Sequence, residues 1–292
     1  MKVFVYTVAG HTFSVRAEEG IDLSEALSQY VPFAEVPAAE KDSVFRLRVV
    51  PASGLDVPQG LTEEFSQDDD GSQIRLCRTP EGAGWFEFSL WGKLSGVLLV
   101  DAAFTQATLA VHDHGSFALN NALMVMYAMR TARLGTALFH AAVIGQGGRG
   151  YLFLGKSGTG KSTHARLWLK YIDGSELVND DNPVVRVLED GTVRVYGSPW
   201  SGKTPCYKNV SLPAGGFVLL EQAPRNVICR LNGIRAYAAL VPSISGKRWD
   251  RAIADGLHET ENALASRIPV WQLQCLPDEE AARLCHETIS KV

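Results

Sequence analysis

The chain has 292 residues, enough for one large domain or two ordinary ones that each bury a hydrophobic core. Hydrophobic residues make up 46% and charged residues 21%, a composition that excludes extended disorder. The 28 Lys and Arg against 32 Asp and Glu give a net charge of −4, and no basic block stands out, so nucleic acid is not an expected partner.

The cysteines and the most apolar segment indicate the setting of the protein. The five cysteines are odd in number and scattered, without a Cys-x-x-Cys pair that would indicate zinc, and they favour a reduced, cytoplasmic location. The N-terminus, residues 1–8, alternates as a strand would and lacks the long apolar core of a signal peptide. The most apolar helix candidate, residues 118–134, contains Arg130 and Arg133, so we expect a core helix and no membrane association.

The first third of the chain has the pattern of a strand-rich domain. Alternating apolar residues bounded by turn formers predict strands at residues 3–8, 12–17, 44–50, 72–77, 85–90, 95–100 and 105–111. One short helix is expected near residues 23–30. The acidic stretch from Glu63 to Asp70 lacks the spaced ligands of a calcium site and is expected to be a solvated loop.

Beyond the apolar helix, the pattern changes to strand, turn and helix, which predicts a domain boundary near residue 135. We therefore expect a strand-rich α+β domain at residues 1–135 and an α/β domain at residues 136–292. The second domain is predicted to have strands at residues 138–144, 151–154, 175–179, 184–188, 193–196, 216–221 and 269–275. Helices are expected at 163–171, along the stripe of Trp249, Ile253 and Leu257, and from Pro277 onward.

The strongest motif follows the apolar strand 151–154. The next eight residues form a complete G-x-x-x-x-G-K-S sequence, and a helix-like run follows it. Glycines let successive backbone N–H groups turn toward phosphate oxygens, Lys161 neutralises the β- and γ-phosphates, and Ser162 can ligate Mg²⁺. The sequence therefore predicts that ATP and Mg²⁺ bind at Gly155, Lys156, Ser157, Gly158, Thr159, Gly160, Lys161, Ser162 and Thr163.

A pair of carboxylates, Asp180 and Asp181, ends the next predicted strand. Neighbouring residues on a strand point to opposite faces, so one aspartate can face a metal ion while the other faces a substrate hydroxyl. Phosphoryl transfer needs this division between a metal anchor and a base. In isolation, an Asp-Asp pair before Pro183 would be a solvated turn, but beside a phosphate-binding loop the catalytic interpretation is favoured.

A histidine is expected at the mouth of the same loop. Strands 138–144 and 151–154 are joined by a glycine-rich segment typical of a hairpin. If Ile144 pairs with Tyr151, the antiparallel register sets His140 opposite Gly155. The alternative for a lone histidine in an apolar strand is a satisfied core residue.

Two further segments are candidates for the site. The loop from Tyr196 to Tyr207 contains Lys203, which either contacts a phosphate or acidic substrate group or belongs to a plain connection. Asn226, after the strand 216–221, could reach the nucleotide, whereas Arg225 is expected to be solvated.

Together, His140, the loop Gly155 to Ser162 and the pair Asp180-Asp181 resemble the catalytic domain of HPr kinase/phosphorylase, which shares its nucleotide core with phosphoenolpyruvate carboxykinase. The resemblance implies a P-loop, mixed-sheet kinase domain. It also implies that Asp180 is the base with His140 as its partner, and that Asp181 and Ser162 hold the metal. It further allows a homo-oligomer, because the family forms hexamers.

The resemblance is to an uncharacterised branch of HPr-kinase-like proteins rather than to the regulatory enzyme. The signature that follows the aspartates in the regulatory enzyme is replaced here by Val195-Tyr196-Gly197-Ser198-Pro199-Trp200. The leading hypothesis is an ATP-dependent kinase that phosphorylates a hydroxyl of a small molecule, peptide or protein serine, with Lys161 and Lys203 among its catalytic residues.

Three other functions are alternatives to this hypothesis. The first is a non-catalytic ATP-binding regulator. The second is a carboxykinase, which normally needs a longer chain with more carboxylate-binding arginines. A signalling GTPase is disfavoured because no N-K-x-D motif follows the P-loop.

Overall fold

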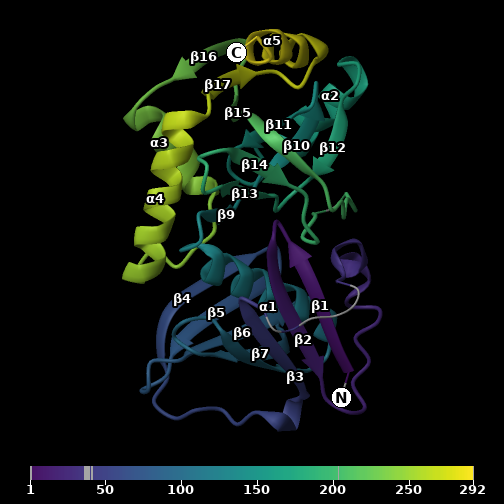
Figure 1. Cartoon of the computed structure of the whole chain (residues 1–292), viewed down its shortest axis with the longest axis vertical. Helices are drawn as coiled ribbons and strands as arrows, with labels where there is room; N and C mark the ends of the chain where they lie inside the picture. The colour runs from purple at the N-terminus through teal and green to yellow at the C-terminus, as the bar shows by residue number, and fades with distance from the viewer. Residues whose placement is uncertain (1, 36–39, 41, 203, 292) are drawn as a thin grey trace. The chain divides into compact units, whose positions relative to one another are not determined.

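The computed structural model describes residues 2–35, 40, 42–202 and 204–291, and it has a mixed α/β fold (Figure 1). The chain divides into two compact units, one ending at Arg130 and the other beginning at Thr131. The division falls at the end of the apolar helix, close to the boundary expected near residue 135. None of the described helices combines the length and the apolar character needed to cross a membrane.

The first unit is built on an eight-stranded mixed sheet in the order β1-β2-β3-β8-β7-β6-β5-β4. β2, β3 and β8 are parallel neighbours, and the other pairs are antiparallel. The strands are β1 (Lys2–Val8), β2 (His11–Ala17), β3 (Phe45–Pro51), β4 (Thr62–Asp69), β5 (Ser72–Arg78), β6 (Gly84–Leu90), β7 (Lys93–Val100) and β8 (Gln106–Val111). The unit also contains the helix α1 (Gly115–Thr131) and the 3₁₀ helices η1 (Ser28–Phe33) and η2 (Ala52–Gly54).

The helix α1 packs on this sheet through small and aromatic residues. Gly96 of β7 lets the helix approach closely, because a Cβ placed there would lie 2.5 Å from the Cβ of Ala118. The Tyr127 hydroxyl donates a hydrogen bond of 3.0 Å to the carbonyl oxygen of Val8. The buried hydroxyl of Tyr127 is thus satisfied by strand backbone.

Two expectations for the first unit were wrong. Residues 23–30 form turns that lead into η1 rather than a regular helix, and η1 contains Pro32. The acidic stretch from Glu63 onward is the edge strand β4, not a loop. β4 pairs only with β5, and nearly all of its side chains are exposed, so it carries no alternation of apolar and polar residues.

The second unit is built on a nine-stranded mixed sheet, in which β12-β10-β11-β15-β14-β13-β9 are successive neighbours and β17 and β16 continue from β15. The strands are β9 (Thr136–Leu138), β10 (Ala142–Gln146), β11 (Arg149–Leu154), β12 (Glu176–Asn179), β13 (Val184–Val187), β14 (Val193–Tyr196), β15 (Ser211–Gln222), β16 (Val227–Leu231) and β17 (Val270–Cys275). The helices are α2 (Lys161–Tyr171), α3 (Ile234–Leu240), η3 (Val241–Ser243), α4 (Arg251–Arg267) and α5 (Glu279–Ile289).

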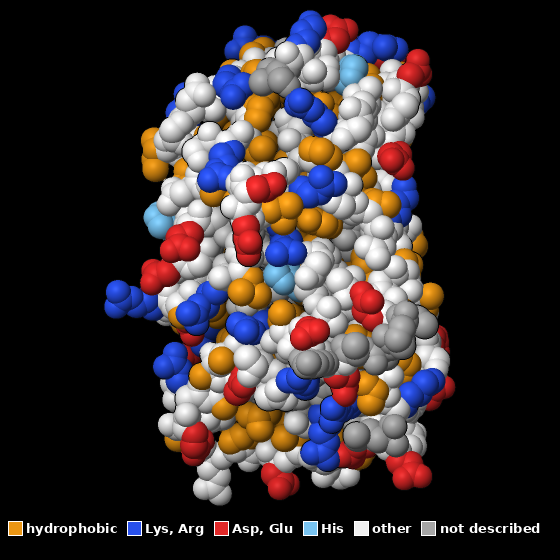
Figure 2. All heavy atoms as spheres, in the orientation of Figure 1, with side chains coloured by type: hydrophobic (Ala, Val, Ile, Leu, Met, Phe, Trp, Pro, Cys, Tyr) orange, Lys and Arg blue, Asp and Glu red, His pale blue; other side chains and the backbone are white. Residues whose placement is uncertain are grey.

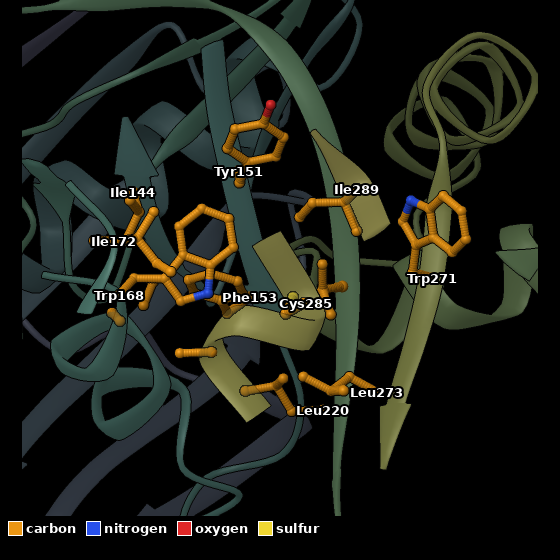
Figure 3. Close-up of a cluster of buried hydrophobic side chains, with 14 residues drawn as sticks. Ile144, Tyr151, Phe153, Trp168, Ile172, Leu220, Trp271, Leu273, Cys285 and Ile289 are labelled. Carbon is orange, nitrogen blue, oxygen red and sulfur yellow. The ribbon is translucent and has the colours of Figure 1, made fainter. Parts of the chain in front are cut away.

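The core of the second unit lies between the sheet and helices α2 and α5. Alternate residues of β10, β11, β15 and β17 face these helices, as the two-residue period of a strand requires. Figure 3 shows Trp168 of α2 beside Phe153, with Cys285 and Ile289 of α5 in the same cluster. Trp168 is fully buried, and its ring centroid lies 5.4 Å from that of Phe153.

Three sequence expectations for the second unit need correction. The strand expected at 138–144 is broken into β9 and β10, which pair with different strands. The stripe that includes Trp249 does not begin the helix, because α4 starts at Arg251 with Asp250 as its N-cap and Trp249 is half exposed. β16 and α3 were not anticipated; most of the side chains of β16 are exposed.

Charged side chains of both signs are mixed over the face of the molecule shown in Figure 2. This mixture agrees with the small net charge of −4 and gives this face no single-sign field that would attract a polyanion.

Removal of a side chain from the core of the second unit tests how much that core stabilises the unit. Leu273 is fully buried, so Leu273→Ala is expected to lower the free energy of unfolding of this unit by about 2–5 kcal/mol. The matched change Leu169→Ala removes a side chain that is 41% exposed and is expected to cost less than about 0.5 kcal/mol. Urea unfolding followed by tryptophan fluorescence measures both, and equal costs would contradict the assigned core.

Candidate active site

The direction of three neighbouring strands brings the predicted site residues to one edge of the sheet. β10 is antiparallel to both β11 and β12, so β11 and β12 run in the same direction. The loop after β11 and the aspartates after β12 therefore leave the sheet at the same edge. His140 lies at this edge too, because it precedes β10. β15 and β17 are parallel to β11 and also end there.

The loop from Gly155 to Ser162 depends on glycine at three positions. Gly155, Gly158 and Gly160 have φ angles of +148°, +78° and +107°, which other residues rarely adopt. Gly160 is the N-cap of α2, so the loop runs directly into the first turn of a helix. A loop of this shape directs backbone N–H groups and the positive end of the helix dipole toward one point, where an anion is stabilised.

Lys161 is the cation of this loop. Its side chain is buried, and its ammonium donates hydrogen bonds to the carbonyl oxygens of Gly155 and Lys156 at 3.0 and 3.3 Å. Burial lowers the pKa of Lys161 below its ordinary value, and the charges of Asp181 and Asp180 oppose that shift. The negative charges of the acidic pair therefore favour the protonated form of Lys161.

The acidic pair is held by a network of neutral side chains. The Asn179 amide donates hydrogen bonds to the Ser198 hydroxyl at 3.1 Å and to the carbonyl oxygen of Trp200 at 3.3 Å. The carbonyl oxygen of the same amide accepts from the backbone N–H of Asp181 at 2.9 Å. A fixed Asn179 therefore fixes the turn that carries the aspartates.

The loop after β14 also lies against the acidic pair. A Cβ placed on Gly202 would be 3.1 Å from the Cβ of Asp181 and 3.2 Å from the carbonyl oxygen of Asp180. This segment therefore lies beside the pair. Lys203, the candidate catalytic residue of this loop, lies outside the described residues.

One carboxylate oxygen of Asp180 has no partner among the described residues. Asp180 is 9% exposed, and among the described residues its Oδ1 has no hydrogen-bond partner. Buried polar atoms are nearly always paired, and an exception has a specific cause, such as a catalytic role or a bound ion. This oxygen can accept a hydrogen bond from a substrate hydroxyl or interact with a cation.

His140 contacts Asp181. The Nε2 atom of His140 lies 3.4 Å from Oδ1 of Asp181, whereas the resemblance implied a pairing with Asp180. Burial raises the pKa of Asp181, and the adjacent charge of Asp180 adds to this, while His140 and Lys161 partly oppose it. The Asn182 amide donates to the other oxygen of Asp181 at 2.7 Å.

The position of His140 follows from the break between β9 and β10. The predicted register is confirmed, since Ile144 pairs with Tyr151, but the ladder begins only at Ala142. Upstream of it, the backbone N–H of Ala141 donates to the carbonyl oxygen of Asp181 at 2.8 Å. The chain thus leaves the sheet toward the acidic pair, which places His140 beside Asp181.

Mg²⁺ fits this site if phosphate oxygens supply part of its ligands. The described residues contain no cluster of three or more His, Cys, Asp or Glu that could hold a metal by itself. Mg²⁺ typically uses one or two carboxylates together with phosphate oxygens, and the partly exposed carboxylate of Asp181 can supply one. Asp181 and Ser162, the first-turn residue of α2 assigned to the metal, could supply ligands once a phosphate is bound.

A cavity of about 710 Å³ adjoins the phosphate loop on the β15 and β17 side. Gly158, Thr159 and Gly160 form one wall of it, together with Thr163 of α2. Gln222 at the end of β15 supports the loop, because its amide donates to the carbonyl oxygens of Gly158 and Thr159 at 3.2 and 3.4 Å. Gln222 was not among the residues predicted for the site, because its one signal in the sequence is its place at the end of an apolar strand.

Asn226 does not reach this site. Its amide donates to Asp278 and Glu280 at 3.1 and 3.0 Å, and its carbonyl oxygen accepts from the backbone N–H of Leu276. Asn226 therefore holds the start of α5, and the expectation of a nucleotide contact was wrong.

No protein-family model and no curated protein matches this chain.

The raised pKa of Asp181 predicts a pH-dependent gain in stability for Asp181→Asn. The folded chain binds the Asp181 proton more tightly than the unfolded chain, so the wild type loses stability as pH rises from the ordinary aspartate pKa of about 3.9 to the raised value. Asp181→Asn has no carboxyl group at this position that can ionise, so it does not lose this stability as pH rises. Its thermal midpoint is expected to exceed that of the wild type at pH 7, and the gain is expected to shrink as pH falls toward 3.9.

Asp190→Asn provides a control of opposite sign. Hydrogen bonds from Thr192 lower the pKa of Asp190, so this carboxylate stabilises the fold above its ordinary pKa and the stabilisation is lost as pH falls. Asp190→Asn should therefore be less stable than the wild type at pH 7. Thermal unfolding over pH 3–8 measures both variants, and a gain for Asp181→Asn that does not depend on pH would contradict the assignment.

Proposed function

We propose that this protein is an ATP-dependent kinase of the HPr kinase-like type, which transfers the γ-phosphoryl group of ATP to a hydroxyl. One observation carries the proposal: a glycine loop that continues into a helix and an acidic pair, of which Asp180 is buried and Asp181 partly exposed, lie at the same edge of one sheet. Phosphoryl transfer requires an anion cradle, a cation and a base in this arrangement.

The loop is proposed to bind the triphosphate. Backbone N–H groups between Gly155 and Ser162 would surround the β-phosphate, and the N-terminus of α2 would add its partial positive charge. The ammonium of Lys161 would exchange its bonds to the loop carbonyls for phosphate oxygens. This exchange is favourable because a charge-assisted bond to phosphate is stronger than a bond to a neutral carbonyl.

Asp180 is the proposed base. As the acceptor oxygen forms its bond to the γ-phosphorus, the bond between that phosphorus and the β,γ-bridging oxygen breaks, and ADP leaves. The hydroxyl proton passes to the unpaired Oδ1 of Asp180, whose position is fixed through Asn179. His140 contributes indirectly, because it contacts and orients Asp181.

The metal side of the site would consist of Ser162 and Asp181. Mg²⁺ bound there would neutralise the charge that develops on the transferred group. The protein's own contribution is to hold the carboxylate of Asp181 through Asn182 and His140. Burial disfavours the ionised form of the Asp181 carboxyl group when no cation is bound. A bound cation would offset this cost, so Asp181 is suited to bind one.

Two substitutions separate binding from chemistry. Lys161→Ala is expected to remove most of the affinity for ATP, because it deletes the cation of the loop. Asp180→Asn keeps the size and most contacts of the side chain, so ATP affinity is expected to stay within about threefold of the wild type while turnover falls by roughly 10³-fold or more. Isothermal titration with ATP and Mg²⁺ measures binding, and release of ADP in the presence of a panel of alcohols and peptides measures turnover.

Single-turnover chemistry with γ-labelled ATP distinguishes a kinase from a regulator that only binds nucleotide. A kinase transfers the label to an acceptor in the panel, and Asp180→Asn suppresses the transfer. The kinase proposal fails if the wild type binds ATP and transfers no label to any acceptor. The role of Asp180 fails if Asp180→Asn and Lys161→Ala lose ATP affinity equally.

A further inference from the structure

The cavity of about 710 Å³ beside the phosphate loop has a different character from the acidic side of the site. Away from the loop, its walls are mainly apolar and come from α2 and from the segments that follow β15 and β17. The side chains that form these walls are Leu167, Leu220, Pro224, Cys275, Leu276 and Pro277. No Asp, Glu, Lys or Arg lies among the described residues that line it.

The cavity and the acidic pair lie on opposite sides of β11 in the order of the sheet. The pair follows β12, two strands to one side, and the cavity borders β15 and β17 on the other. A triphosphate in the loop with its γ-phosphate toward Asp180 would therefore have its α-phosphate toward the cavity. The group that is attached to the α-phosphate would therefore enter the cavity and contact its apolar walls. Such walls suit an uncharged flat ring.

His164 supplies a directional polar group in this cavity. It lines the cavity from the first turn of α2, and its ring is packed edge-on against Phe153. The indole N–H of Trp168 donates to Nε2 of His164 at 3.1 Å. Since an indole nitrogen can only donate, Nε2 carries no proton and the neutral ring has its proton on Nδ1.

The Nδ1–H of His164 is available to a ligand. Within the described chain it has no hydrogen-bond partner, although the residue is only 3% exposed. Burial also lowers the pKa of His164 to about 4, so the ring is neutral at pH 7 and presents one donor rather than a charge.

We propose that this cavity receives the purine base of the phosphoryl donor and that the Nδ1–H of His164 donates a hydrogen bond to an unprotonated ring nitrogen of that base. The inference rests on the proposed function, because it assumes that the loop holds the triphosphate. It assigns a role in base recognition to His164, Leu167 and Ala223, residues outside the G-x-x-x-x-G-K-S motif.

Inorganic tripolyphosphate provides the test, because it has the phosphates of ATP and no base. Affinities of the full-length protein for ATP and for tripolyphosphate, each with Mg²⁺, are measured by isothermal titration. The wild type is expected to bind ATP at least tenfold more tightly. If neither ligand binds, the proposed function fails; if both bind with equal affinity, the loop is confirmed as a phosphate site and the inference about the cavity is overturned.

Two variants alter the cavity and leave the loop intact. Ala223→Trp places a large ring in the space proposed for the base and is expected to reduce ATP affinity to that of tripolyphosphate. Leu167→Ala removes part of an apolar wall and is expected to weaken ATP roughly 3- to 10-fold. Leu169→Ala, on the same helix but outside the cavity, is the matched control and should change neither affinity. An unchanged ATP affinity in Ala223→Trp contradicts the proposal.

The hydrogen bond is tested with deaza analogues of ATP. Each analogue lacks one ring nitrogen of the base. The wild type should bind the analogue that lacks the accepting nitrogen, one of 1-, 3- and 7-deaza-ATP, roughly 3- to 10-fold more weakly than ATP, which is the loss of affinity expected when one neutral hydrogen bond is removed. In His164→Phe, which keeps a ring and lacks the donor, ATP and that analogue should bind equally, and tripolyphosphate affinity should match the wild type. If all three analogues bind the wild type as well as ATP does, the role of His164 is overturned.

Discussion

The candidate site depends on the direction of one short strand, β10. Because β10 is antiparallel to β11 and to β12, it places the phosphate loop and the acidic pair at the same edge of the sheet. A parallel β10 between the same neighbours would require crossover connections and would leave no hairpin between β10 and β11. The tight turn at Gly147 and Gly148, both with positive φ, fixes this direction and the register of the hairpin.

Charged groups that are buried or partly buried gather at this edge of the sheet. Lys161 has a lowered pKa and Asp181 a raised one, and burial is the largest cause of both shifts. Each shift means that the folded protein holds an ionised group at a cost in stability. The Oδ1 of Asp180, which has no partner within the described part of the chain, adds a further cost. Proteins retain such costs mainly where a ligand offsets them, which is why the arrangement favours a binding and catalytic role over a structural one.

Local signals in the sequence were sufficient for the parts of the site that are contiguous in the chain. The glycine loop, the helix after it and the pairing of Ile144 with Tyr151 follow from residue spacing and turn chemistry. Features set by distant partners were not predictable in this way. The break before β10 depends on pairing with β13 and Ile244, and the edge strand β4 has no buried face to produce a pattern. Asn226 was misassigned because its partners lie some fifty residues further along the chain, at the start of α5.

A crystal structure with Mg²⁺ and a non-hydrolysable ATP analogue tests the central claim most directly. We expect the triphosphate to lie within the loop between Gly155 and Ser162, with the γ-phosphate on the side of Asp180 and the ammonium of Lys161 bound to phosphate oxygens. A loop without density for the analogue at saturating concentration would contradict the account. So would a bound triphosphate whose γ-phosphate points away from the acidic pair.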